Sequence, residues 1–123
     1  MYIIDTHAHY DDERFDGDRD ELLTSLSSHN IGIVINSGAS MKGVRDTIAL
    51  TEKYDFVYGS VGIHPSDVME LEVENTYEEL KSLALRDKIV AVGETGLDYY
   101  WDEPDREIQK KHFERQLELA REI

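Results

Sequence analysis

The sequence contains no cysteine, and only two prolines and eight glycines among its 123 residues. The lack of cysteine excludes disulfide bonds and thiolate metal sites, and it suits the cytoplasmic location that we expect. No stretch approaches the ~20 apolar residues of a membrane span, and the N-terminus lacks a basic region followed by an apolar segment. We therefore expect neither a membrane partner nor a signal peptide. The absence of low-complexity runs argues against disorder.

Basic residues are also scarce. The chain has 13 lysines and arginines against 27 aspartates and glutamates, which gives a formal net charge of −14. Such a surface repels nucleic acid at long range. If the substrate is a polyanion, a bound divalent cation is one way to reverse the sign of the charge locally.

The segment from Tyr2 to Asp12, YIIDTHAHYDD, places two histidines after a short apolar run. This run predicts a buried strand near residues 2–5. Alternate side chains of an extended segment point the same way, so His7 and His9 share a face and can bind one metal ion. The alternative is that each histidine is an ordinary buried core residue, and H-x-H pairs also occur by chance. The carboxylates on both sides of the pair favour the metal site.

Apolar runs and helical periodicities alternate along the chain. The predicted strands lie near residues 2–5, 31–36, 56–62 and 89–93, and the predicted helices cover 19–30, 41–54, a segment beginning at 76, and 105–123. The second strand, IGIVIN, has the continuous apolar character of a strand buried on both faces. On the last helix, the apolar face is formed by Ile108, Phe113, Leu117 and Ala120.

This alternation predicts an α/β fold of four consecutive βα units, with parallel strands and right-handed crossovers. No linker or change in composition divides the chain, so we expect one domain over residues 1–123.

Polar residues follow each predicted strand. They are His7 and His9 after the first, Asn36 and Ser37 after the second, His64 after the third, and Glu94 and Asp98 after the fourth. The carboxyl ends of parallel strands lie at one edge of the sheet, which is where active sites sit in α/β folds. Mixed imidazole and carboxylate ligands suit Zn, Mn, Fe or Ni, and Mg remains possible. The sequence therefore predicts a metal site at this edge.

Several nearby residues have two interpretations. His64 is either a loop histidine held in place by Pro65 or a substrate-binding residue. Tyr99 and Tyr100 either stack on bases or cover the end of the sheet, and for Trp101 we expect covering. His112 lies on the last helix, where we expect packing or surface exposure.

Three motifs in this order, DTHAH near the N-terminus, GIHP after the third strand and GETGLDYY after the fourth, resemble the TatD family of metal-dependent deoxyribonucleases. The resemblance covers the whole chain. It implies a (β/α)8 barrel with a two-metal site, which hydrolyses DNA phosphodiester bonds with a metal-bound hydroxide, typically from the 3′ end.

The resemblance also implies roles for individual residues. His7 and His9 bind the first metal, and Glu94 is the catalytic carboxylate that bridges both metals. His64 lies close to the substrate phosphate, and Asp98 supports the site from behind. Mg, Mn and Zn are not distinguished by these residues.

The chain departs from the family pattern in its length. A complete barrel of this type has about 250 residues, and the chain has 123. We therefore expect the N-terminal half of the fold, without the two histidines and the aspartate that the family carries on later strands. Two unpaired sheet edges lead us to expect a homo-oligomer or pairing with a complementary half-barrel.

Three functions are compatible with these features. The first is a metal-dependent deoxyribonuclease that is weak or inactive as the isolated chain. The second is a non-catalytic metal-binding half-barrel or assembly partner. The third is a hydrolase of small phosphoesters, which no physical argument from these residues excludes.

Overall fold

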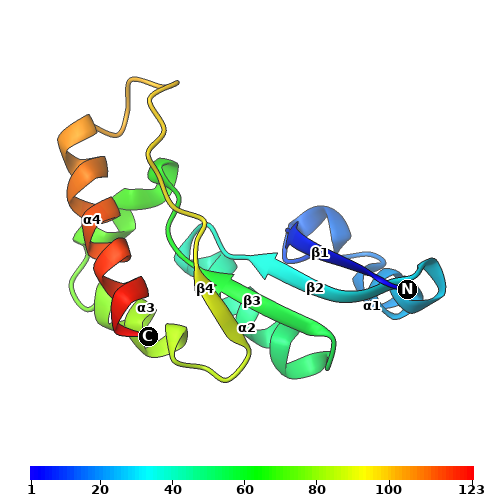
Figure 1. Cartoon of the computed structure of the whole chain (residues 1–123). Helices are drawn as coiled ribbons and strands as arrows, with labels where there is room; N and C mark the ends of the chain where they lie inside the picture. Colours follow the sequence, from blue (N-terminus) through cyan, green and yellow to red (C-terminus); the bar gives the residue numbers. More distant parts are fainter.

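A computed structural model describes residues 1–123 and contains one sheet of four parallel strands in the order β1-β2-β3-β4 (Figure 1). The strands are β1 (Ile3–Ala8), β2 (Ile31–Ser37), β3 (Val57–Val61) and β4 (Ile89–Val92). Each strand is followed by helical structure, which confirms the predicted series of four βα units, consistent with half of a (β/α)8 fold. The first strand is longer than predicted and includes His7.

The helical segments follow the predicted order. They are η1 (Glu13–Phe15), α1 (Arg19–Ser25), η2 (Leu26–His29), α2 (Met41–Lys53), η3 (Pro65–Glu72), α3 (Thr76–Ala84) and α4 (Arg106–Glu122). Ser40 caps the N-terminus of α2, because its side chain accepts a hydrogen bond from the backbone N–H of Gly43. None of these helices combines the length and the apolar character that crossing a bilayer requires.

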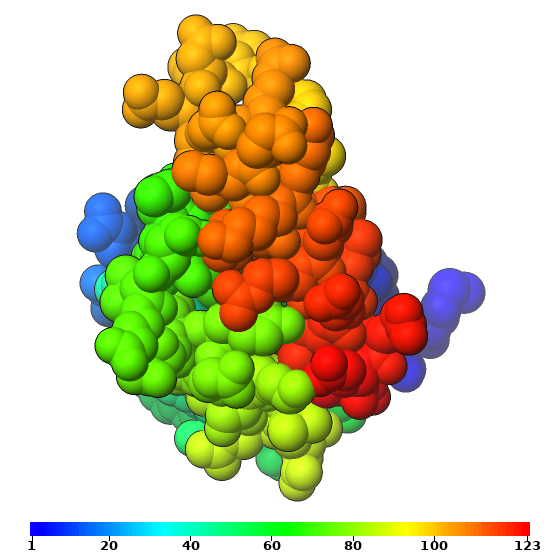
Figure 2. All heavy atoms as spheres, turned by 90° about the vertical axis from the view of Figure 1, so that its left-hand side faces the viewer, coloured from blue at the N-terminus to red at the C-terminus, as the bar shows by residue number.

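The buried apolar residues form two clusters. One, which includes Val44, Val61 and Leu80, joins α2 and α3 to β3, and Leu119 of α4 also belongs to it. The other lies near β1 and β2 and includes Leu23, Val34 and Val57. Figure 2 shows α4 lying against η3 and α3, while the segment that precedes α4 projects beyond them. The helices therefore pack against the sheet through these two clusters.

The prediction that the first strand is buried was wrong. Tyr2, Ile3 and Ile4 are 59%, 58% and 49% exposed, because β1 packs mainly against β2 and few side chains from the helices cover it. The prediction that β2 is buried on both faces was also wrong, since of its apolar residues only Val34 is fully buried. Helices cover one face of this sheet, and the other face is partly open.

The buried face of α4 is not its apolar face. The fully buried residues are Gln109, His112, Gln116 and Leu119, whereas Leu117 is 51% exposed and Ala120 is also exposed. Ile108 and Phe113, the other two members of the predicted apolar face, are half-buried. The polar residues can be buried because their side chains form hydrogen bonds with η3 and with the segments that follow β3 and β4. His112 is thus a packing residue, as one of the two interpretations predicted.

The chain after β4 crosses closely over the end of β3. A Cβ atom added to Gly62 would lie 2.7 Å from the carbonyl carbon of Gly93, 2.8 Å from its Cα and 3.0 Å from the nitrogen of Glu94. All three atoms belong to the backbone, which cannot rotate away as a side chain can. Gly62 is therefore required for this crossing, whereas Gly17 has no atom within 4 Å of the equivalent position.

We expect Gly62→Ala to destabilise the chain by about 1–3 kcal/mol through overpacking against the Gly93–Glu94 backbone. Gly17→Ala is the matched control, with a change within about 0.5 kcal/mol, because its surroundings are open and its φ is not positive. Urea denaturation followed by circular dichroism measures both values. Equal midpoints for the two variants would contradict the requirement for glycine at position 62.

Candidate metal centre

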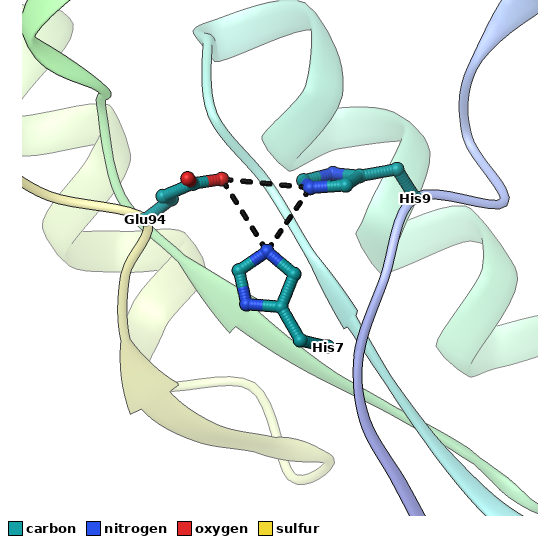
Figure 3. A group of neighbouring side chains, drawn as sticks. All are labelled: His7, His9 and Glu94. Carbon is teal, nitrogen blue, oxygen red and sulfur yellow. Dashed lines mark hydrogen bonds and ion pairs between the residues drawn. The ribbon is translucent and has the colours of Figure 1, made fainter.

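Three side chains, from the end of β1 and from the segments that follow β1 and β4, converge at the carboxyl end of the sheet (Figure 3). The Nε2 atoms of His7 and His9 lie 3.1 Å apart. The Oε2 atom of Glu94 lies 3.6 Å from the Nε2 of His7 and 3.5 Å from that of His9. The structure thus brings the three predicted metal ligands together, although 85 positions separate His9 from Glu94 in the sequence.

Strand geometry places the two histidines on one face. His7 lies on β1 and His9 follows its last residue, Ala8. Ala8 points the opposite way and belongs to a buried cluster with Leu23 and Val34. The two imidazole rings lie edge to face with centroids 5.0 Å apart. The side chains of His7 and His9 are 56% and 40% exposed, so the site opens to solvent.

Glu94 reaches the histidines because the chain after β4 leans across β3 toward β2. The backbone N–H of Gly93 donates to the carbonyl of Val61 at the end of β3. The next N–H, that of Glu94, donates to the carbonyl of Gly38, the residue that follows β2. Each bond carries the chain one strand closer to β1. The crossing over Gly62 therefore determines where the carboxylate of Glu94 lies.

Asn36 holds the chain that follows His9. Its side-chain oxygen accepts from the backbone N–H of Tyr10 at 2.6 Å, and its amide nitrogen donates to Asp11 and to Thr47, both at 2.8 Å. Asn36 is fully buried on β2, and these three bonds satisfy its amide group. The sequence placed Asn36 at the correct edge but gave it no role. The sequence feature that could have identified this role is a polar residue at the end of an otherwise apolar strand, IGIVIN.

Arginines stabilise the same loop. Arg19 donates from Nε to the carbonyl of Tyr10 at 2.6 Å and from Nη2 to that of Asp12 at 2.9 Å. Hydrogen bonds from the Arg14 side chain hold the pKa of the Asp12 carboxyl at about 2, well below its usual value. The carboxylate of Asp12 thus forms an ion pair with the Arg14 guanidinium, 2.8 Å away, in the loop that follows His9.

The donor set fits a divalent cation. Ligand atoms bound at about 2.1 Å in a tetrahedral arrangement lie about 3.4 Å apart. The distances between the Nε2 atoms of His7 and His9 and the Oε2 atom of Glu94 are 3.1, 3.6 and 3.5 Å, which are close to this value. Two imidazole nitrogens at 3.1 Å repel each other through their lone pairs unless a proton or a cation lies between them. The geometry therefore suits three corners of one coordination sphere.

His64 lies at the same end of the sheet but outside this triangle of ligands. It precedes η3, and its Nδ1 accepts from the backbone N–H of Ser66 at 3.2 Å. The backbone N–H of His64 donates to the carbonyl of Ala39, the second residue after β2. His64 is thus a fixed loop histidine, and its predicted role in substrate binding stays a prediction.

Asp98 forms hydrogen bonds within its own loop and with α4. Its carboxylate accepts from the backbone N–H of Tyr100 at 2.9 Å, and its own N–H donates to the side chain of Gln109 at 3.1 Å. The structure does not bring its carboxylate into the triangle of ligands. Its predicted supporting role also stays a prediction.

The aromatic run after Asp98 projects into solvent. Tyr100 and Trp101 are 82% and 63% exposed and pack edge to face on each other, with centroids 4.7 Å apart. The expectation that Trp101 covers the end of the sheet was wrong. The guanidinium of Arg106 lies 4.6 Å from the ring centroid of Tyr99 and stabilises the loop by a cation–π contact.

Comparison with known proteins agrees with this geometry. The profile of the family described as TatD related DNase matches residues 4–123. The chain is 34% identical over 121 residues to the uncharacterized metal-dependent hydrolase YabD of Bacillus subtilis, covering 98% of this chain and 47% of YabD. It is 27% identical over 121 residues to the 3′-5′ ssDNA/RNA exonuclease TatD of Cronobacter sakazakii, covering 98% of this chain and 46% of that protein.

The fold comparison gives the same result. The crystal structure of YjjV, a TatD homolog from Escherichia coli, matches with a TM-score of 0.83 and 34% identity, covering 98% of this chain and 47% of YjjV. The chain thus spans slightly less than half the length of the relatives it matches. Since the family profile matches nearly every residue, and the site geometry agrees with it, the chain belongs to the TatD family.

Proposed function

We propose that the chain carries the first metal site of a hydrolase that cleaves DNA phosphodiester bonds from the 3′ end. The observation that carries this proposal is the triangle formed by His7, His9 and Glu94. The family description as a DNase and the exonuclease named among the relatives support the choice of substrate.

The chain's own residues have distinct roles in this proposal. The Nε2 atoms of His7 and His9 offer lone pairs, which places the ring protons on Nδ1 in the neutral form. Glu94 adds a negative charge and has a second oxygen free to bridge to another cation. A bound divalent cation would lower the pKa of its water and neutralise phosphate charge. That neutralisation is needed because the formal net charge is −14.

His64 is proposed to contact the substrate phosphate. Since its Nδ1 accepts the N–H of Ser66, the neutral ring carries its proton on Nε2. That N–H is available to donate to a phosphate oxygen. The hydrogen bond from the His64 backbone to Ala39 fixes the residue beside the loop after β2.

A second candidate function is metal binding without turnover, by a half-barrel that completes its site only with a partner. The observation favouring it is that the structure brings together potential ligands for one cation only, His7, His9 and Glu94. Hydrolysis of small phosphoesters is the third candidate, because three metal ligands do not by themselves select a polymer.

We expect Glu94→Gln to weaken Mn²⁺ binding by roughly 100-fold or more, because a neutral amide replaces the only carboxylate of the triangle. Isothermal titration calorimetry with MnCl₂ measures the affinity. Glu118→Gln, at an exposed position on α4, is the matched control and should bind as the unsubstituted chain does. Equal affinities for the two variants would place the metal elsewhere.

Cleavage of a single-stranded DNA oligonucleotide labelled at its 5′ end tests the proposed reaction. We expect weak shortening from the 3′ end, which EDTA abolishes and Mn²⁺ or Mg²⁺ restores. Cleavage that persists in EDTA would rule out the proposed chemistry. Metal-dependent hydrolysis of bis(p-nitrophenyl) phosphate with intact DNA would favour the small-phosphoester candidate, and Mn²⁺ binding without any hydrolysis would favour the non-catalytic one.

Both edges of the sheet are unpaired, and each exposes apolar side chains. Ile3 and Ile4 on β1 are 58% and 49% exposed, and Val90 on β4 is 53% exposed. An apolar groove of about 550 Å³ runs along β4, and eight of its ten lining residues are hydrophobic. We propose that a second set of βα units covers these edges, either in a second copy of the chain or in a complementary half-barrel.

Sedimentation velocity at increasing concentration tests this assembly. We expect the isolated chain to self-associate, and Val90→Lys on the β4 edge to shift the distribution toward monomer, because a charged side chain blocks edge pairing. A folded monomer at every concentration would contradict self-association. Lys110→Glu, at an exposed position on α4, alters charge without touching the edge and serves as the control.

A further inference from the structure

The chain contains two glutamines, Gln109 and Gln116, and both are 2% exposed. They lie seven residues apart on α4 and therefore on one face of the helix. Glutamine is mostly an exposed residue in folded proteins, so two buried ones on one face need a physical reason. The reason lies in the segments that they contact.

Gln116 pairs with both backbone groups of Ile63. The N–H of Ile63 donates to the Gln116 Oε1 at 2.7 Å, and the Gln116 Nε2 donates to the carbonyl of Ile63 at 3.1 Å. The side-chain amide thus takes the place of a neighbouring strand at a residue that lies beyond the end of β3. Ile63 is fully buried, and it directly precedes His64. Without Gln116, both backbone groups of Ile63 would be buried without a partner.

Gln109 connects the two ends of the loop that follows Glu94. Its Oε1 accepts from the backbone N–H of Asp98 at 3.1 Å, and its Nε2 donates to the carbonyl of Pro104 at 3.0 Å. The residues between these two points include the exposed Tyr100 and Trp101. The loop projects from the rest of the chain (Figure 1), so these two bonds fix its base.

His112 lies between the two glutamines on the same face and anchors the helix itself. Its Nε2 contacts the carboxylate of Glu72 on η3, and Lys111 donates to the same carboxylate at 2.6 Å. Burial lowers the pKa of His112 even though the Glu72 carboxylate acts in the opposite direction. The helix is therefore held against η3 independently of the two glutamine contacts.

We propose that Gln109 and Gln116 are positioning residues of the site: each uses its side-chain amide to fix one of the loops that carry His64 and Asp98. This inference rests on the proposed function for the role of His64 and on the predicted supporting role of Asp98. The arrangement explains why α4 buries two amides beside Leu119 while Leu117 and Ala120 are exposed. Alternative side chains of similar size, such as Met or Leu, fill the same space but cannot pair with a backbone peptide.

Gln116→Met and Gln109→Met test the proposal, with Leu119→Ala as the control. Leu119 is fully buried on the same helix face but forms no side-chain hydrogen bond. NMR spectra of the ¹⁵N-labelled chain without metal report on each loop. We expect Gln116→Met to shift and broaden the ring signals of His64, and Gln109→Met to shift the amide signals of Asp98 and Tyr100. Each variant should leave the other loop unchanged, and Leu119→Ala should lower thermal stability while changing neither.

Ligand binding gives a second measurement. In the Mn²⁺-loaded chain, we expect Gln116→Met to weaken binding of thymidine 5′-phosphate about five- to tenfold, the effect of one misplaced hydrogen bond, with Mn²⁺ affinity unchanged. If the unsubstituted chain binds no Mn²⁺, the proposed function fails, while the metal-free spectra still test the positioning role.

The proposal is overturned if the glutamine variants disturb both loops to the same degree, or leave both unchanged while stability falls as it does in Leu119→Ala. If Gln116→Met does not fold, Gln116→Glu replaces it. Its carboxylate keeps an acceptor for the N–H of Ile63 and loses the donor to its carbonyl. An intermediate shift of the His64 signals supports the proposal, and signals identical to those of the unsubstituted chain contradict it.

Discussion

The metal centre depends on one backbone crossing. In a flat sheet, β1 and β4 would lie three strand spacings apart, roughly 14 Å. The ligand atoms of His7, His9 and Glu94 nevertheless lie within 4.8 Å of one another. The sheet curls, and the chain after β4 passes over Gly62 to donate a hydrogen bond to Gly38 beyond β2. A side chain at position 62 would block that path. The position of Glu94 beside the two histidines therefore requires a glycine at position 62.

The sequence predicted the topology, and it predicted that His7, His9 and Glu94 lie together, because both follow from local patterns combined with parallel strand pairing. Alternating apolar runs and helical periods are properties of short segments, and parallel pairing brings the ends of all strands to one edge. The wrong predictions concern the burial of side chains, and they have another cause. The exposure of Ile3 and Ile4, and the burial of Gln109 and Gln116, depend on which neighbours cover each element in space. Hydrophobicity alone assigns a buried amide to the surface, because it does not register the backbone groups that the amide satisfies.

Charge explains why a cation matters here more than in a neutral protein. The chain carries a formal net charge of −14, and the loop after His9 adds Asp11 and Asp12 close to the site. The Asp12 carboxylate is paired with the Arg14 guanidinium at 2.8 Å, which offsets part of this charge. A polyanionic substrate approaching this edge meets repulsion unless positive charge is present locally. A bound divalent cation supplies that charge in the same place where it would act on the substrate.

The arrangement of the candidate metal ligands can be considered separately from the proposed turnover. The three ligands, the crossing that places Glu94, and Asn36, which holds the chain after His9, all lie within the four βα units. None of them requires the surfaces at the exposed edges of β1 and β4. The helical scaffold is also local, since α4 reaches back to Ile63 through Gln116 and to η3 through His112. Any dependence of the proposed activity on additional strands would therefore arise from groups that act on the substrate or on a second cation, rather than from the arrangement of His7, His9 and Glu94.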